Sequence, residues 1–230
     1  MGKNKLARWA EIKTFTNVME PDSWAVKNNF FYLRGCWKEK YFGNGNPIVL
    51  ELGCGKGEYT MGMAAIMPER NFIGIDIKGA RIWRGAKAAL ENELSNVLFI
   101  RTRVEFLNSF FDEDEIDEIW LTFPDPHEKR RNSLRRLTSP VFLNKYRFFI
   151  KDNGIIHLKT DNNILFNYTL NIALKNNLEI ITSTTDLYNS GIVDDILGIR
   201  TFYEAKFINE AKKICYLSFR LRKGKEIVYD

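Results

Sequence analysis

Cysteine and histidine are scarce in this chain of 230 residues. It contains three cysteines, Cys36, Cys54 and Cys215, and two histidines, His127 and His157. The cysteines are odd in number and widely spaced, which argues against a disulfide framework or a zinc site and fits a reducing cytoplasm. With so few nitrogen and sulfur ligands, we expect no transition-metal site and no other bound metal.

Long apolar runs are also missing from the sequence. No stretch of about 18 consecutive apolar residues occurs, so we expect no transmembrane helix. The N-terminal residues 1–6 have no apolar signal core, and position 6 lacks the serine or threonine of a myristoylation site. Hydrophobic residues make up 45% of the chain and charged residues 27%, as in ordinary globular proteins. The expected location is the cytoplasm.

Positive charge is in modest excess, with 34 Lys and Arg against 29 Asp and Glu and a net charge of +5. This balance permits nucleic-acid binding without requiring it, so the distribution of the charge carries more information. The densest cluster holds five cations within eight residues: Lys129, Arg130, Arg131, Arg135 and Arg136.

A regular alternation of strands and helices begins at Pro47 and predicts the fold class. We expect strands at 48–52, 71–76, 97–100, 116–123, 155–159, 178–184 and 214–221. We expect helices at 59–67, 79–94, 104–111, 139–151 and 162–176. The pattern indicates an α/β protein with a Rossmann-like, mostly parallel twisted sheet and helices on both faces.

The predicted organisation is an N-terminal arm followed by one domain. Residues 1–46 are mixed basic and aromatic, with one or two short helical pieces, and 47–230 form the α/β domain. Residues 152–154 read as a turn before a strand. Residues 186–207 are poorly periodic and are expected to form a long functional loop.

The most informative segment is the apolar run that ends at Pro124-Asp125-Pro126. The two prolines cannot continue a strand, so they hold Asp125 rigidly at the strand's carboxyl end. Ligands of open α/β sheets bind at this edge, and the basic cluster follows at once. A rigid acid beside phosphate-attracting cations suggests chemistry on a polyanion. An ordinary strand exit followed by a solvated charge run remains an equal alternative.

A glycine-rich turn, residues 51–57, follows the first strand of the predicted domain. Glycines at such a turn let the backbone approach a ligand, although backbone geometry alone could also require them. Glu58 stands where dinucleotide-binding turns have their third glycine, and a carboxylate there would repel a pyrophosphate. With Glu51 before the glycines, the turn suits a cationic ligand such as S-adenosylmethionine. Asp76 ends the next strand, about 20 residues on, where a carboxylate reaches ribose hydroxyls.

Three further positions are ambiguous from the residues alone. Asp161 closes a predicted strand and precedes a helix, so it could cap that helix, contact a substrate, or do both. Residues 201–207 look like a short amphipathic structural piece. His127 has no evident acid–base partner, and we expect it to shape the site or stack rather than to catalyse.

Taken together, these residues resemble the tRNA (guanine-N7-)-methyltransferases. The motifs appear in the family's order over residues 47–221, and the combination is far more specific than the glycine-rich turn alone. The residues that carry the resemblance are the Glu51–Gly57 turn, Phe123-Pro124-Asp125-Pro126-His127 with Lys129, Arg135-Arg136-Leu137-Thr138-Ser139-Pro140, Lys159-Thr160-Asp161, Thr201, Tyr203-Glu204 and Lys206-Phe207.

The resemblance implies a Rossmann-like methyltransferase that uses S-adenosylmethionine (SAM) to methylate N7 of a guanine, usually position 46, in the variable loop of tRNA. It further implies a role for each matching residue. Asp125 lies at the active centre as the catalytic residue. The cofactor is bound by Glu51, Gly53, Gly55, Asp76, Arg103 and Asp125. The substrate is bound by Lys129, Asp161, Thr201, Phe202, Tyr203 and Glu204. RNA is contacted by Lys129, Arg130, Arg131, Arg135 and Arg136.

The chain departs from the family pattern at two places. His127-Glu128 replaces the Trp-Pro of many bacterial members, and histidine there resembles other branches of the family. Arg103 stands where an acid or amide is common beside the adenine, and arginine cannot accept a hydrogen bond from an adenine amino group. The backbone or Glu105 would then have to accept it.

Other functions stay open at this point. They are a SAM enzyme with a small-molecule or protein substrate, a non-catalytic RNA-binding protein of the same fold, and a nicotinamide-dependent dehydrogenase, which Glu58 disfavours. We expect tRNA as the partner and no association with a membrane. We expect the protein to be a monomer or a homodimer.

Overall fold

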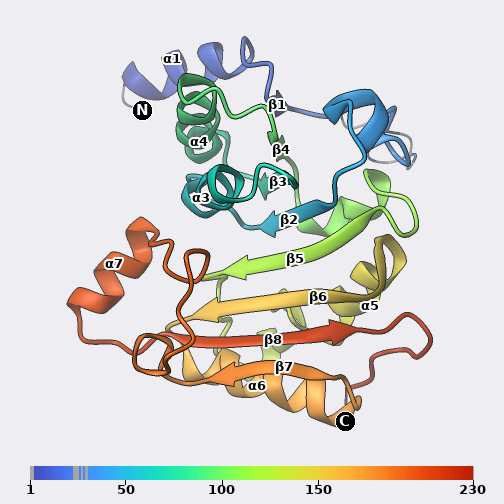
Figure 1. The fold of residues 1–230 in the computed structure, drawn as a ribbon, viewed down its shortest axis with the longest axis vertical. Helices are drawn as coiled ribbons and strands as arrows, with labels where there is room; N and C mark the ends of the chain where they lie inside the picture. Colours follow the sequence, from blue (N-terminus) through green and yellow to red (C-terminus); the bar gives the residue numbers. More distant parts are fainter. Residues whose placement is uncertain (1–2, 23–25, 27, 29–30, 230) are drawn as a thin grey trace. The chain divides into compact units, whose positions relative to one another are not determined.

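The computed structural model describes residues 3–22, 26, 28 and 31–229, and it divides into two compact units (Figure 1). Unit 1 is Met1–Asp112 and unit 2 is Glu113–Asp230. Within the described ranges, no helix is long and apolar enough to cross a lipid bilayer.

Unit 1 is built on four parallel strands in the order β1-β4-β3-β2. They are β1 (Val18–Met19), β2 (Ile48–Leu52), β3 (Asn71–Asp76) and β4 (Val97–Arg101). Every residue of β2 and β3 is buried, as expected for central parallel strands that are covered on both faces. The carboxyl ends of β2 and β3 are in register, with Leu52 opposite Ile75, so the residues that follow them share one edge of the sheet.

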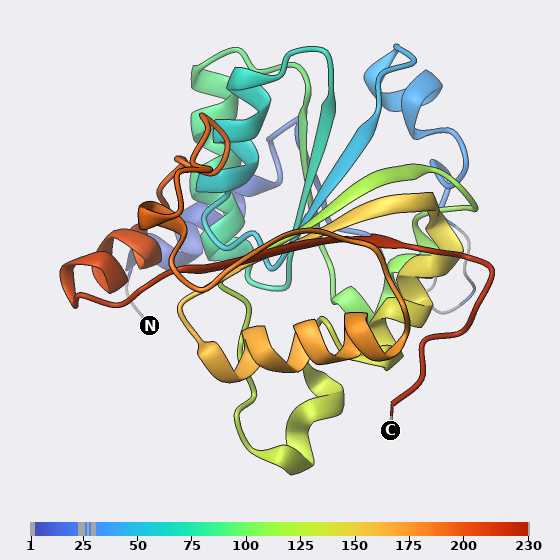
Figure 2. The same ribbon diagram turned by 60° about the horizontal axis from the view of Figure 1, so that its bottom comes forward.

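The helices of unit 1 pack against these strands and against each other. They are α1 (Lys3–Ile12), α3 (Glu58–Ile66) and α4 (Gly79–Glu91), with a π-helical turn η1 (Lys38–Phe42) and a 3-10 turn η2 (Val104–Ser109). Figure 2 shows α3 and α4 side by side. The amino group of Lys87 and the indole of Trp83 both bond the Glu11 carboxylate, at 3.0 and 2.9 Å, which fastens α1 to α4.

Unit 2 has four strands in the order β5-β6-β8-β7, with β5 and β6 parallel and the other pairs antiparallel. They are β5 (Ile116–Thr122), β6 (Ile150–Thr160), β7 (Ile180–Thr184) and β8 (Cys215–Leu221). The helices are α5 (Pro140–Phe149), α6 (Asn163–Lys175) and α7 (Phe202–Asn209), with 3-10 turns η3 (Arg130–Arg135) and η4 (Leu187–Asn189). In Figure 2, α5 and α6 run along one face of these strands.

The structure corrects the sequence-based prediction at several places. Residues 150–151, predicted as the end of a helix, begin β6, and the helix predicted at 104–111 is the 3-10 turn η2. Residues 152–154 were expected to form a turn, but they continue β6, where Asn153 has a φ of +61° and the β5–β6 register shifts. The segment 186–207, expected as a loop, contains η4 and the start of α7. The short strand β1 was not predicted; it joins the sheet through β4.

Candidate functional site

The glycine-rich turn of unit 1 leaves open space above two of its glycines. Gly53, Gly55 and Gly57 all have positive φ, at 78°, 58° and 71°. A Cβ on Gly53 would meet no atom within 4 Å, whereas one on Gly57 would lie 2.6 Å from the Phe99 ring. Gly57 therefore allows α3 to pack closely, while Gly53 and Gly55 form a cradle that a ligand can approach.

Two buried carboxylates flank this cradle. Asp76, at the end of β3, accepts hydrogen bonds from the backbone N–H groups of Gly55 at 3.0 Å and Lys78 at 2.7 Å. Glu51 accepts from the backbone N–H of Thr60 at 2.8 Å and also from its hydroxyl. Burial raises the pKa of the Cys54 thiol well above its usual value, and the negative charges of Glu51 and Asp76 raise it further. The turn is thus an acidic environment, which suits a sulfonium and an amino group.

A cavity of about 390 Å³ lies in the same unit. It begins beside Asp76, because Ile77 follows that residue and the N–H of Thr102 donates to the Asp76 carbonyl at 3.2 Å. Arg103 lines the cavity, with its guanidinium 2.9 Å from the Glu105 carboxylate. The lining residues are Glu20, Pro21, Val26, Ile77, Arg101, Thr102, Arg103 and Phe106.

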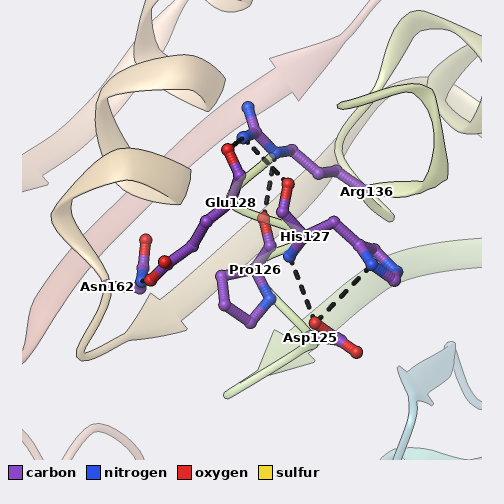
Figure 3. Close-up of polar contacts among 6 residues, drawn as sticks. All are labelled: Asp125, Pro126, His127, Glu128, Arg136 and Asn162. Carbon is purple, nitrogen blue, oxygen red and sulfur yellow. Dashed lines mark hydrogen bonds and ion pairs between the residues drawn. The ribbon is translucent and has the colours of Figure 1, made fainter. Parts of the chain in front are cut away.

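In unit 2, the loop after β5 presents the Asp125 carboxylate to solvent, with 74% of the side chain exposed. The loop leaves the strand through Phe123, whose φ of +49° is unusual for an aromatic residue. The backbone N–H of His127 donates to Asp125 Oδ1 at 3.1 Å, and His127 Nδ1 lies 3.7 Å from the same oxygen (Figure 3). His127 therefore shapes the loop and faces the Asp125 carboxylate, an acidic partner that the sequence did not reveal.

Arg136 supports this loop by hydrogen bonds to its backbone. Its guanidinium donates to the carbonyls of Pro126 at 3.0 Å, His127 at 3.2 Å and Glu128 at 3.4 Å (Figure 3). It also lies 4.3 Å from the centre of the Tyr168 ring, and the residue is 4% exposed. The cation is therefore committed to three backbone carbonyls, and little of its surface is left for a phosphate.

The other four cations of the cluster are exposed. Lys129 precedes η3, and the three arginines lie on it. Within the described residues, none of the four forms an ion pair with a carboxylate, so their charges are available to an anionic partner. These residues, which we call the basic run, are Lys129, Arg130, Arg131 and Arg135.

A buried ion pair ties the start of α7 to the end of β6. The amine of Lys159 lies 2.8 Å from the Glu204 carboxylate, and both side chains are fully buried. The same amine donates to the carbonyls of Leu197 at 2.7 Å and Ile199 at 3.1 Å. Burial lowers the pKa of Lys159, although the charge of Glu204 acts in the opposite direction. This pair fixes the segment that leads into α7.

The residues at the start of α7 divide into buried and exposed members. The Thr201 hydroxyl caps the helix by accepting from the N–H of Glu204 at 3.2 Å, and Tyr188 donates to the Glu204 carboxylate at 2.6 Å. Phe202 and Tyr203 are 57% and 42% exposed. The family resemblance placed all four residues at the substrate, whereas the structure leaves two aromatic rings accessible.

Asp161 does not cap α6. The cap is Asn162, whose side-chain oxygen accepts from the N–H of Leu165 at 2.9 Å. Asp161 instead accepts a hydrogen bond from Lys212 at 3.1 Å. Of the two roles considered for Asp161, the cap is therefore wrong and a substrate contact stays a prediction.

Sequence reasoning missed several partners of these residues. Lys212 contacts Asp161, Tyr188 contacts Glu204, and Asn162 donates to Glu128 at 2.7 Å, and these bonds join residues 16 to 51 positions apart. The carbonyls that Arg136 binds lie 8 to 10 positions before it. No periodic pattern signals such pairs. Within the described part of the chain, His, Cys, Asp and Glu side chains form no group of three or more that could hold a metal ion.

Comparison with known proteins defines first the class and then the family. The fold resembles solved structures of the 16S rRNA methyltransferase KamB (TM-score 0.62, 15% identity, 80% of this chain and 92% of that one) and of the antibiotic-resistance methyltransferase Kmr (TM-score 0.54, 18% identity, 82% and 91%). These likenesses show a Rossmann-like fold, which confirms the predicted fold class.

Residues 45–217 match the model of a family described as "Putative methyltransferase". Proteins named tRNA (guanine-N(7)-)-methyltransferase are similar over nearly the whole chain. The one from Bacteroides fragilis is 48% identical over 99% of this chain and 89% of its own length. The one from Christiangramia forsetii is 47% identical over 96% of this chain and 99% of its own length. The chain belongs to the tRNA (guanine-N7)-methyltransferase family.

Proposed function

We propose that the protein transfers the methyl group of SAM to N7 of the guanine at position 46, in the variable loop of tRNA. The observation that carries this proposal beyond family membership is the loop after β5. It holds the exposed Asp125 carboxylate in a fixed conformation, four residues before the first of four exposed cations that form no ion pair within the described part of the chain. An acid that can hydrogen-bond a base and cations that can hold its phosphates are thus built into one segment.

The reaction needs positioning more than proton transfer. Guanine N7 carries a lone pair and has no proton to lose, so no general base is required. The cofactor supplies an electrophilic methyl group on a sulfonium. The protein's part is to align the nucleophile and to exclude misaligned encounters, which can contribute several kcal/mol to catalysis.

The cofactor site belongs to unit 1 in this proposal. Gly53 and Gly55 let the backbone approach the ligand, and Asp76 binds the ribose hydroxyls. Glu51 contributes negative charge that favours the sulfonium and the amino group. Arg103 lines the cavity next to Asp76, and its guanidinium can only donate hydrogen bonds.

In this proposal, carboxylates recognise the guanine through hydrogen bonds. Asp125 and Asp161 accept hydrogen bonds from N1 and the exocyclic amine, and Asp125 also binds the methionine end of the cofactor. In duplex RNA, N7 faces a deep groove that side chains cannot reach, so the base must be unstacked. Phe202 and Tyr203 offer exposed rings for stacking. Thr201 and Glu204 contribute indirectly, because the helix cap and the buried ion pair fix the position of the start of α7.

The basic run holds the tRNA backbone, and Arg136 acts through the loop that it supports. Lys129 is placed to contact both the base and the phosphates next to it. The protein works on tRNA in the cytoplasm as a monomer or homodimer without a metal. Residues 47–230 form the catalytic domain and 1–46 an N-terminal arm.

The test is methyl transfer from radiolabelled SAM to unmodified tRNA transcripts, followed by borohydride–aniline cleavage at the methylated base. We expect one cut at the variable-loop guanine, which disappears when that guanine is replaced. Incorporation at another position would contradict the proposed site. Binding of tRNA and SAM without incorporation would instead indicate a non-catalytic RNA-binding protein.

A further inference from the structure

We infer that Glu20, in the N-terminal arm, accepts a hydrogen bond from the amino group of the cofactor's adenine and thereby selects adenosine. This inference rests on the proposed cofactor and adds a specificity-determining residue from outside the predicted catalytic domain. It starts from the 390 Å³ cavity of unit 1.

The cavity has the position and the walls for a purine ring. It starts beside Asp76, the carboxylate assigned to the ribose, so the base attached to that ribose would extend into it. Two apolar lining residues are incompletely covered by protein, since Ile77 is 52% and Phe106 41% exposed. Large apolar side chains left open in a cavity favour a flat, weakly polar ligand between them.

The polar edge of adenine requires an acceptor that most of the lining does not supply. The exocyclic amine of adenine donates, while the guanidinium groups of Arg101 and Arg103 only donate. The Glu105 carboxylate is bound to Arg103, with contacts of 2.9 and 3.5 Å, and it does not line the cavity. Among the described lining residues, Glu20 is the carboxylate.

Glu20 is held in place by an arginine that is itself fixed. Its Oε1 accepts from Arg101 Nη1 at 2.7 Å, and both side chains are 28% exposed. Arg101 also donates to the Ile77 carbonyl at 3.3 Å, and its guanidinium lies 4.4 Å from the centre of the Trp9 ring. Arg101 engages one oxygen of Glu20, so the second can accept from the ligand. The arm thus brings an oriented carboxylate to the cavity.

The test compares two ligands that differ only at the edge of the purine ring that carries the 6-substituent. S-Adenosylhomocysteine carries the 6-amino donor, whereas S-inosylhomocysteine carries a carbonyl oxygen that would face the carboxylate. We expect the unmodified protein to bind the adenosine ligand at least about tenfold more tightly in calorimetry, since tenfold corresponds to about 1.4 kcal/mol, near the worth of one hydrogen bond. In Glu20→Ala, affinity for the adenosine ligand should fall about tenfold and affinity for the inosine ligand should stay or rise.

Two variants separate this role from a structural one. Glu20→Gln keeps an acceptor oxygen and should keep most of the preference for adenosine. Glu105→Ala, the matched control, removes the neighbouring carboxylate outside the cavity and should leave the preference unchanged. If Glu20→Ala weakens both ligands equally, Glu20 merely supports the fold and the inference is overturned. Failure of the unmodified protein to bind either ligand would contradict the proposed cofactor itself.

Discussion

Lys159 and Glu204 form an ion pair of 2.8 Å in which neither side chain has any exposed surface. Removing one partner of such a pair leaves an uncompensated buried charge, which costs about 3 to 5 kcal/mol. We expect Lys159→Met to lower the free energy of unfolding by about this amount in urea denaturation. The double variant Lys159→Met/Glu204→Leu should recover most of the loss, because it removes both charges.

The same pair tests how α7 contributes to activity. Because Lys159 also bonds the carbonyls of Leu197 and Ile199, its loss should loosen the segment that presents Phe202 and Tyr203. In the double variant, the KM for tRNA should therefore rise more than kcat falls. A double variant as unstable as Lys159→Met would show that the side chains' shape, rather than their charge, holds this region.

Replacement of Asp125 should separate catalysis from binding. The carboxylate is exposed and bonds the backbone of its own loop, so Asp125→Ala should change the stability of the fold little. If Asp125 is the catalytic residue, as proposed, turnover should fall by about a thousandfold or more, whereas tRNA affinity in a filter-binding assay should stay within about threefold. Asp125→Asn keeps one acceptor oxygen and should retain more activity than Asp125→Ala. Lost tRNA binding with normal turnover of the bound complex would refute the assignment.

Arg136 and Arg135 are neighbours in sequence but should behave differently on mutation. Arg135 is exposed, so Arg135→Ala should reduce the salt dependence of tRNA binding by about one counterion and raise KM. Arg136 supports the Asp125 loop, so Arg136→Ala should lower kcat and stability and leave the salt slope nearly unchanged. Binding measured at several salt concentrations distinguishes them, and a reduced slope in Arg136→Ala would place it on the RNA.

Local patterns were enough to predict the central fold. The strand at 71–76 was placed with its observed ends because a buried parallel strand leaves a continuous apolar run between turn residues. The glycine-rich turn and Asp76 were also located correctly, since the turn follows one strand and Asp76 ends the next. The prediction failed at Asn153, where a left-handed residue interrupts β6 without ending it, and at β1, whose two residues are too few to show a period.

The site residues show a similar limit. Sequence reasoning grouped Arg136 with one lysine and three other arginines because it uses only charge and spacing. The distinction depends on the three carbonyls of the Asp125 loop, which the fold brings to Arg136. The sequence left Asp161 open as a cap of α6 or a substrate contact, because Asp is a good cap; in the structure Asn162 is the cap and Asp161 pairs with Lys212.

Tyrosines that are partly or fully buried should make the protein sensitive to alkali. Burial raises the pKa values of Tyr41, Tyr168 and Tyr216 to about 12, from an ordinary value near 10. Between these values the folded state holds protons that the unfolded chain has lost. The stabilising contribution is therefore complete below about pH 10 and is lost as the pH rises towards 12.

Absorbance titration of the phenols checks this expectation. In the native protein, part of the nine tyrosines should ionise near 12, and all should ionise near 10 in denaturant. Tyr216→Phe should remove one of the late phenols and reduce the fall in unfolding free energy at alkaline pH. If all nine titrate near 10 while the protein stays folded, these rings are more accessible to water than the structure indicates.

Two glycines of the same turn should respond differently to a single methyl group. A Cβ on Gly57 would lie 2.6 Å from two atoms of the Phe99 ring and 3.2 Å from the Cα of Gly85, at a φ of +71°. Overpacking and left-handed strain add up, so Gly57→Ala should cost about 2 to 5 kcal/mol of unfolding free energy. The binding of S-adenosylhomocysteine to Gly57→Ala should decrease only in proportion to the fraction of the protein that is unfolded.

Gly53→Ala places the same methyl group in open space, so the strain of its φ of +78° is the main penalty, about 1 to 2 kcal/mol. The methyl group would occupy the space through which the cofactor approaches the backbone. Affinity for S-adenosylhomocysteine in calorimetry should therefore fall well over tenfold in a protein that is still folded. A Gly53→Ala variant with unchanged affinity would mean that the ligand does not lie over this turn, and that Gly53 serves the backbone geometry alone.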